Sequence, residues 1–206
     1  MTVALTALAA CGHPGGPAKP RADRVAPDSF QVAIETTRGQ VVMMAIRRWA
    51  PHGVDRFYSL VRQHYYDNAP IYRVVRGFVA QFGLAADPRL TAVFRKRVIP
   101  DDTVRQSNRR GVVSFASAGP GTRTTQLFIN LIDNPRLDTA GRGGYPPIGR
   151  VVQGMELVDR FNAEYEGTMP RRVQDSISLQ GDAYIRRAFP RLDHVRSMRI
   201  VREWKH

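Results

Sequence analysis

Short apolar runs that follow one another along the chain, with only turns between them, restrict the fold more than any other feature. Two of these runs, VVSFASA (residues 112–118) and QLFINLI (residues 126–132), flank a turn rich in glycine and threonine. Their β-branched and aromatic residues are typical of strands. Strands that are adjacent in sequence favour an antiparallel sheet over a doubly wound parallel sheet.

The remaining pattern predicts further strands and two helices. Residues 30–35 alternate between apolar and polar, and the apolar run at residues 41–46 follows a turn, which predicts a hairpin. After Pro51, four apolar side chains share the i, i+3, i+4, i+7 stripe of a helix: Val54, Phe57, Tyr58 and Val61. A second helix is predicted at residues 154–165, a loop at 84–110, and strands at 71–82 (two, around Gly77), 147–152 and 195–202. We therefore expect a mainly β fold, a closed eight-stranded antiparallel β-barrel capped by two α-helices.

The chain divides into a short leader and one domain. Residues 29–206 have the length and composition of a single globular domain, because the chain of 206 residues is 43% hydrophobic and 24% charged. A C-terminal segment, at about residues 166–206, extends this domain, and residues 166–192 predict a short helix and a packed loop. After the N-terminus, no apolar run reaches the roughly 18 residues of a membrane span.

Residues 1–28 are interpreted as a truncated signal with a lipobox, followed by a flexible tether. The stretch Leu8-Ala9-Ala10-Cys11 resembles a bacterial lipobox, and the residues after it are dense in glycine, proline and alanine. We expect an exported protein, periplasmic or anchored to the membrane by lipid attached to Cys11. The alternative is a disordered N-terminus with an incidental cysteine and a cytoplasmic protein.

The net charge of +13 is compatible with nucleic acid, an anionic membrane surface or acidic proteins as partners. The basic residues are spread along the chain and are not clustered with aromatic ones, so we interpret them as solvated faces and expect no nucleic-acid partner.

Familiar catalytic motifs are also excluded. Ala116 stands where a nucleophile elbow around Ser117 needs glycine, and Thr124 stands where a dinucleotide fingerprint needs its third glycine. The histidines have no metal-ligand spacing, so neither a metal nor a cofactor is predicted.

Arg73 lies within a predicted strand, on the same face as Ile71 and Val75. An arginine whose stem covers an apolar surface is the ordinary interpretation. However, YRVVRGFVAQ (residues 72–81) resembles the cyclophilin signature F-H-R-I-I-x-G-F-x-x-Q. SFASAGP (residues 114–120) with QLFI (residues 126–129) resembles a second signature of that family, S-M-A-N-A-G-P followed by S-Q-F-F-I. Three shorter matches follow in the family's order, at residues 137–138, 148–151 and 154–158.

The resemblance implies a peptidyl-prolyl cis–trans isomerase that acts without a cofactor on proline-containing peptides and unfolded proteins, and we expect a monomer. It implies that Arg73 is the catalytic hydrogen-bond donor and that Gln81 steadies it. The apolar cup for the proline ring would include Phe78, Val79, Phe128 and Leu137, although each of these could instead be ordinary barrel core. The remaining residues that would bind substrate are Ala116, Ser117, Gln126, Tyr145 and Ile148.

Three departures from the family pattern concern the same site. Arg136 stands where many members have a tryptophan that binds cyclosporin, so weak cyclosporin binding is expected. Tyr72 replaces a histidine, and Tyr145 and Ile148 replace the usual histidine and phenylalanine of the lower cup. Two alternatives to an isomerase remain at this point: a non-catalytic module that binds proline peptides, and a nucleic-acid binder driven by charge.

Overall fold

The computed structural model describes residues 21–166 and 171–205. Its strands are β1 (Ser29–Thr36), β2 (Gly39–Ile46), β3 (Ala69–Pro70), β4 (Arg73–Val75), β5 (Val79–Phe82), β6 (Val112–Phe115), β7 (Leu127–Asn130), β8 (Pro147–Gln153) and β9 (His194–Trp204). The α-helices are α1 (Pro51–Arg62), α2 (Pro88–Phe94), α3 (Met155–Val158), α4 (Arg171–Gln180) and α5 (Asp182–Ala188), and short 3-10 turns are η1 (Arg47–Trp49), η2 (Pro135–Asp138) and η3 (Ala140–Arg142). Cys11 and the lipobox lie outside the described residues.

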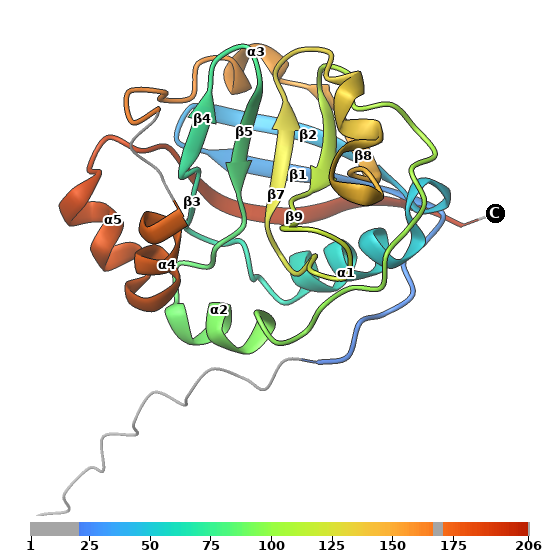
Figure 1. The fold of residues 1–206 in the computed structure, drawn as a ribbon, viewed down its shortest axis with the longest axis horizontal. Helices are drawn as coiled ribbons and strands as arrows, with labels where there is room; N and C mark the ends of the chain where they lie inside the picture. The colour runs from blue at the N-terminus through green and yellow to red at the C-terminus, as the bar shows by residue number, and fades with distance from the viewer. Residues whose placement is uncertain (1–20, 167–170, 206) are drawn as a thin grey trace, which may run out of the picture.

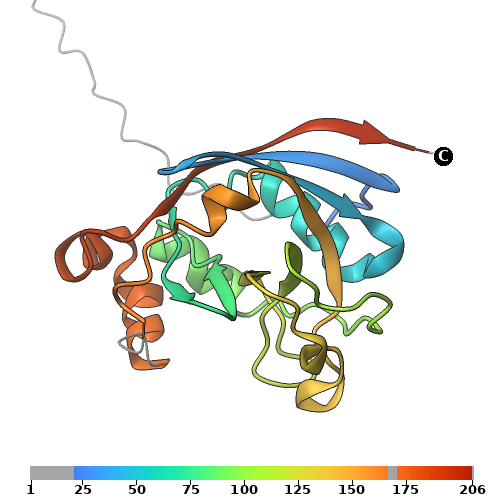
Figure 2. The ribbon, with the colours of Figure 1, turned by 90° about the horizontal axis from the view of Figure 1, so that it is seen from above.

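The strands form one antiparallel sheet in the order β3-β9-β1-β2-β8-β6-β7-β5-β4. The sheet curls, so that β9, β1 and β2 lie across the interior from β4 and β5 (Figures 1 and 2). The antiparallel, mainly β fold expected from the sequence is therefore confirmed. The strand at residues 41–46 pairs with the preceding strand as the predicted hairpin, with Val32 opposite Met43.

The predicted closed barrel of eight strands is wrong in its details. The described sheet has nine strands and ends at β3 and β4, which are hydrogen-bonded to other strands and not to each other. Pro70 has no N–H group, so β3 cannot continue its ladder there. The amide of Ile71 still donates to the carbonyl of Asp193, whereas Arg73 pairs with Gln81 of β5. The chain thus leaves one edge of the sheet and joins the other within a few residues.

The inner faces of the strands and one side of α1 form the main hydrophobic core. In β1 and β2 every second residue is buried, in agreement with the alternation in the sequence. Phe30, Phe57 and Tyr66 are among the largest fully buried side chains of this core. α1 begins with Pro51 at its first turn, as the sequence predicts, and buries the predicted stripe. Burial of this many large side chains is the main favourable term in folding.

The helices differ from the sequence prediction in three places. α2 lies within residues 84–110, which were expected to be a loop; Asp87 caps it by accepting a hydrogen bond from the amide of Arg89. The helix expected at residues 154–165 is only the four-residue α3, because the amide of Asn162 donates to Asp193 at 2.7 Å and holds the chain in a different direction. Residues 171–192 contain the expected short helix, α5, and a loop in which Leu192 is buried, but they also contain a further helix, α4, that the sequence did not predict.

The structure describes residues 21–28 of the expected leader and tether, and these residues are packed against the domain. Residues 21–28 pack along α1, since the amide of Arg24 donates to Ser59 Oγ and the amide of Ala26 donates to Asp55 Oδ1. Asp23 also forms a 2.8 Å ion pair with the buried guanidinium of Arg56. The described helices fall short of the length and apolar character needed to span a membrane.

Gly149 of β8 provides a test of the strand packing. A Cβ at this position would lie 2.1 Å from the carbonyl oxygen of Met44 on β2, so the two strands would have to separate. We expect Gly149→Ala to lower the free energy of unfolding in urea by about 3 kcal/mol or more, the upper range of overpacking. Gly77→Ala is the control, since its Cβ would meet no atom within 4 Å and only its φ of +70° is unfavourable, at about 1–2 kcal/mol. Equal losses for both variants would contradict the packing of β8 against β2.

Candidate active site

Neighbouring strands place four residues of the candidate site in one row. Arg73 of β4 is opposite Gln81 of β5, Gln81 is opposite Phe128 of β7, and Phe128 is opposite Ser114 of β6. Residues that pair directly across antiparallel strands share one face of the sheet. The alternate residues of the same strands, such as Ala80, belong to the main core. The row therefore lies on the outer face.

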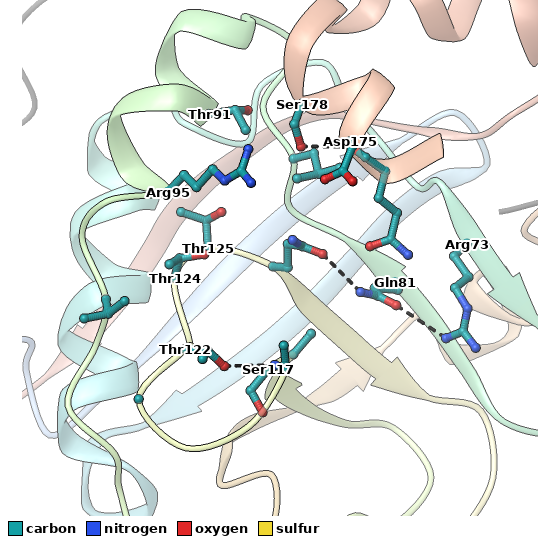
Figure 3. Close-up of a pocket in the computed structure, with 17 residues that line it drawn as sticks. Arg73, Gln81, Thr91, Arg95, Ser117, Thr122, Thr124, Thr125, Asp175 and Ser178 are labelled. Carbon is teal, nitrogen blue, oxygen red and sulfur yellow. Dashed lines mark hydrogen bonds between the residues drawn. The ribbon is translucent and has the colours of Figure 1, made fainter. Parts of the chain in front are cut away.

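Hydrogen bonds link the polar members of this row to its neighbours. Arg73 Nη1 donates to Gln81 Oε1 at 3.4 Å, and Gln81 Nε2 donates to Gln126 Oε1 at 3.2 Å (Figure 3). The hydroxyl of Tyr72 donates to the same Gln126 oxygen at 2.5 Å. Burial raises the pKa of Tyr72 far above its ordinary value, so the hydroxyl keeps its proton and remains a donor. The amide of Gln81 is thus held with its oxygen toward Arg73.

Tyr72 is a site residue whose role the sequence analysis missed. Its ring is fully buried in a second hydrophobic cluster, together with Leu84, Ile177 of α4 and Ile185 of α5. The C-terminal helices therefore contact the residue that orients Gln126. The sequence contained a signal for this role, because Tyr72 replaces a histidine immediately before Arg73, but its hydrogen-bond partner Gln126 is 54 positions away along the chain.

An outer apolar cluster lies beside the polar row. It is built around the buried side chains of Val79, Phe128 and Leu137, with partly buried residues at its margin: Phe78, Ala116, Ala140 and Tyr145. The rings of Phe128 and Tyr145 meet edge to face, with their centroids 5.6 Å apart. This cluster is separate from the main core, and an apolar ring of a ligand could pack against it.

A buried polar network supports three walls of the outer apolar cluster. Asn108 Nδ2 donates to the carbonyl of Tyr145 and to Asp138 Oδ1, each at 2.9 Å. Asn134 Nδ2 donates to the carbonyl of Phe78 at 3.1 Å. Although burial alone would raise the pKa of Asp138, hydrogen bonds from Ser107 and Asn108 hold that pKa below its usual value. These partners, which sequence reasoning also missed, keep the loops around the cluster in place.

A groove of about 700 Å³ runs beside the polar network. Arg73 and Gln81 lie on one side of it and Arg95 lies on the other (Figure 3). Threonine side chains and the small residues Ala116, Ser117 and Ala118 line its floor, so an extended backbone can approach closely. α4 supplies a further wall, with Gln174, Asp175 and Ser178.

The structure brings together all but one of the predicted site residues that it describes. The polar row, the outer apolar cluster or the groove contains Arg73, Phe78, Val79, Gln81, Ala116, Ser117, Gln126, Phe128, Leu137 and Tyr145. Ile148 is the exception and corrects the prediction: it is fully buried in the main core, on the inner side of the sheet, and cannot contact a ligand in the outer cluster.

The chemistry available at this site is non-covalent. It combines a cationic hydrogen-bond donor, an amide that orients the donor, an apolar surface and a groove for an extended chain. Within residues 21–166 and 171–205, no three histidine, cysteine, aspartate or glutamate side chains lie together as metal ligands. Such a site can bind a peptide, desolvate it and stabilise a charge distribution in it.

Comparison with known proteins identifies the family of the chain. Residues 31–181 match the family model described as cyclophilin type peptidyl-prolyl cis-trans isomerase. The chain belongs to the cyclophilin family. A relative from Gibberella zeae, peptidyl-prolyl cis-trans isomerase-like 1, is 31% identical over 150 residues, which are 70% of this chain and 88% of the relative. Peptidyl-prolyl cis-trans isomerase B of Escherichia coli K12 is 30% identical over 142 residues, 66% of this chain and 86% of the relative.

Solved cyclophilin structures share the fold. A cyclophilin type isomerase from Cryptosporidium parvum superposes with a TM-score of 0.61 at 20% identity, covering 85% of this chain and 99% of that protein. The same Cryptosporidium protein in the presence of the dipeptide Ala-Pro gives a TM-score of 0.59 at 21% identity, covering 84% of this chain and 99% of that protein. The curled antiparallel sheet with its helices is therefore a cyclophilin fold.

The hydroxyl of Tyr72 gives a test of the hydrogen-bonded network in this cyclophilin. In Tyr72→Phe the ring still fills its cluster, but Gln126 loses a donor and Gln81 is held less firmly. We expect kcat for isomerisation of a proline peptide to fall by about two- to twelvefold, the equivalent of one hydrogen bond of about 0.5–1.5 kcal/mol. Tyr58→Phe is the matched control, because the hydroxyl of Tyr58 binds Glu203 away from the site. A kcat equal to that of the control would contradict the role of Tyr72.

Proposed function

We propose that this cyclophilin accelerates the cis–trans rotation of X-Pro bonds in unfolded or extended segments of proteins. The observation that carries the proposal is the position of Arg73, held by Gln81 at the edge of the outer apolar cluster. The proline ring packs against Phe128 and Leu137, and the flanking peptide lies along Ala116 and Ser117. No covalent intermediate is needed, in keeping with the absence of a nucleophile motif in the sequence.

The mechanism is stabilisation of the twisted imide. Rotation about the bond removes its resonance, with a barrier of about 18–20 kcal/mol. In the twisted state the proline nitrogen regains a lone pair and accepts a hydrogen bond, and Arg73 is the donor. Because a guanidinium presents its N–H donors in a rigid fork, Arg73 acts by donating a hydrogen bond and needs no proton transfer. The donor binds the twisted state better than either planar isomer, which lowers the barrier.

The size of the effect is within the reach of such a site. Uncatalysed isomerisation takes about 10–100 s. Shortening that time to about a millisecond requires four to five decades in rate, or about 5.5–7 kcal/mol. One charged hydrogen bond in a partly desolvated site contributes about 2.7–4 kcal/mol, as oxyanion-hole donors do. Desolvation and orientation of the peptide in the groove supply the remainder.

Arg73→Ala tests this role. We expect kcat/KM in an isomerisation assay without a coupling protease, such as exchange measured by NMR, to fall by about 10²–10³-fold, the loss that follows removal of a charge-stabilising donor. Arg76→Ala is the control, since the guanidinium of Arg76 donates to the backbone carbonyl of Asp159 and takes no part in the network around Gln81. Near-normal activity of Arg73→Ala would contradict the role of Arg73 as the hydrogen-bond donor. Peptide binding by the wild type without any acceleration would instead identify a non-catalytic module.

We also propose that the protein is exported and anchored by lipid on Cys11. The support is the Leu-Ala-Ala-Cys sequence at residues 8–11 and the glycine- and proline-rich stretch that follows it. A cyclophilin in the periplasm would meet newly translocated chains before they fold. We expect Cys11→Ser to move the protein from the membrane fraction to the soluble fraction of the producing bacterium. A variant that stays in the membrane fraction would rule out the acyl anchor.

The partners expected from the sequence stay proposals. Arg136 cannot provide the flat apolar contact of a tryptophan, so weak cyclosporin binding is proposed. The proposed state is a monomer with no nucleic-acid partner. Nucleic-acid binding at physiological salt would contradict the last point, because charge-driven binding falls steeply with salt.

A further inference from the structure

Arg136 lies at the rim of the outer apolar cluster and its role is not explained by the mechanism above. It is exposed, it belongs to η2, and its Cζ is 4.9 Å from the ring centroid of Phe78. The Cζ of Arg73 is 5.9 Å from the centroid of the same ring. Two guanidinium groups therefore adjoin one aromatic side chain at the place where the proline would bind.

Both of these positive charges lack an acidic partner in the described part of the chain. The ion pairs found there involve other arginines or histidines. The carboxylates closest to Arg136 in sequence bind elsewhere: Asp133 accepts from the amide of Arg110, and Asp138 accepts from Ser107 and Asn108. The rim beside Phe78 is therefore positive, and the acidic side chain that lines the adjoining groove, Asp175, belongs to α4.

Stacking on Phe78 does not use up the hydrogen-bonding capacity of Arg136. A guanidinium that lies over an aromatic ring keeps its N–H donors at the edge of its own plane. That edge matches the two oxygens of a carboxylate, which arginine binds with two parallel hydrogen bonds. An apolar or amide side chain would gain neither the charge interaction nor both hydrogen bonds.

We propose that Arg136 is a specificity-determining residue, which pairs with the carboxylate of an Asp or Glu adjacent to the substrate proline. This inference rests on the proposed isomerase function and names its preferred substrate class. An exposed pair of this kind changes the rate by about two- to fivefold.

The test compares matched peptides that differ by one charge. Two pairs of peptides carry Glu or the isosteric Gln, in one pair immediately before the proline and in the other immediately after it. We expect one pair to show a Glu/Gln ratio of kcat/KM of about two to five with the wild-type protein at low salt. The ratio should approach one in 1 M NaCl, since the screening length there is about 3 Å.

Substitutions then assign the preference to one residue. Arg136→Gln should bring the Glu/Gln ratio to about one, and Arg136→Glu should bring it below one. Arg202→Gln is the matched control and should keep the wild-type ratio, because Arg202 is also exposed and stacked on an aromatic ring, with its Cζ 4.8 Å from the centroid of Trp204 in β9. Wild-type ratios of one for both pairs, or a preference that survives Arg136→Gln, would overturn the inference. Acceleration of the Gln peptides tests the proposed isomerase function separately.

Discussion

Antiparallel pairing of β4, β5 and β7 is the constraint on which the site depends. It places Arg73, Gln81 and Phe128 side by side on the outer face, while the alternate residues of the same strands, such as Val74, Ala80 and Ile129, belong to the main core. A shift of one residue in any of these pairings would exchange the two faces and bury the charged group. The arrangement of the site is thus a consequence of strand register, and the same burial that stabilises the sheet holds the active groups in place.

Two groups of residues outside this row hold it in place. From one side, Tyr72 connects the cluster formed by α4 and α5 to Gln126, and so to the amide that orients the arginine. From the other side, Asn108 and Asn134 fix the loops that carry the apolar walls. Arg73 and Arg136, which both lie beside the ring of Phe78, make this part of the rim positive. The preference that we propose for Asp or Glu beside the proline therefore depends on Arg136, which takes no part in the rotation step.

Much of the site could be predicted from the sequence, because the residues of the row lie within short motifs that also alternate between the two faces of a strand. Ile148 was misplaced because a motif match shows proximity in sequence and does not show which face a side chain occupies. The helix α2 was missed although Asp87 and Pro88 are good start signals, because its seven residues are too few for a helical stripe to stand out beside the polar and basic residues 95–110. Whether the sheet closes, and which residues contact Tyr72, depends on contacts between distant segments. The periodicity of apolar residues in the sequence does not show such contacts.

The cluster formed by α4 and α5 is separate from the main core, and this separation has a consequence for heating. Small, peripheral clusters open locally at a lower free energy than the central strands of a sheet. Opening of α4 and α5 would remove a wall of the groove and loosen Tyr72, while the pairing of β4 with β5 and β7 persists. A warmed protein would then first isomerise peptides more slowly, and it would lose the activity altogether only when the sheet itself melts.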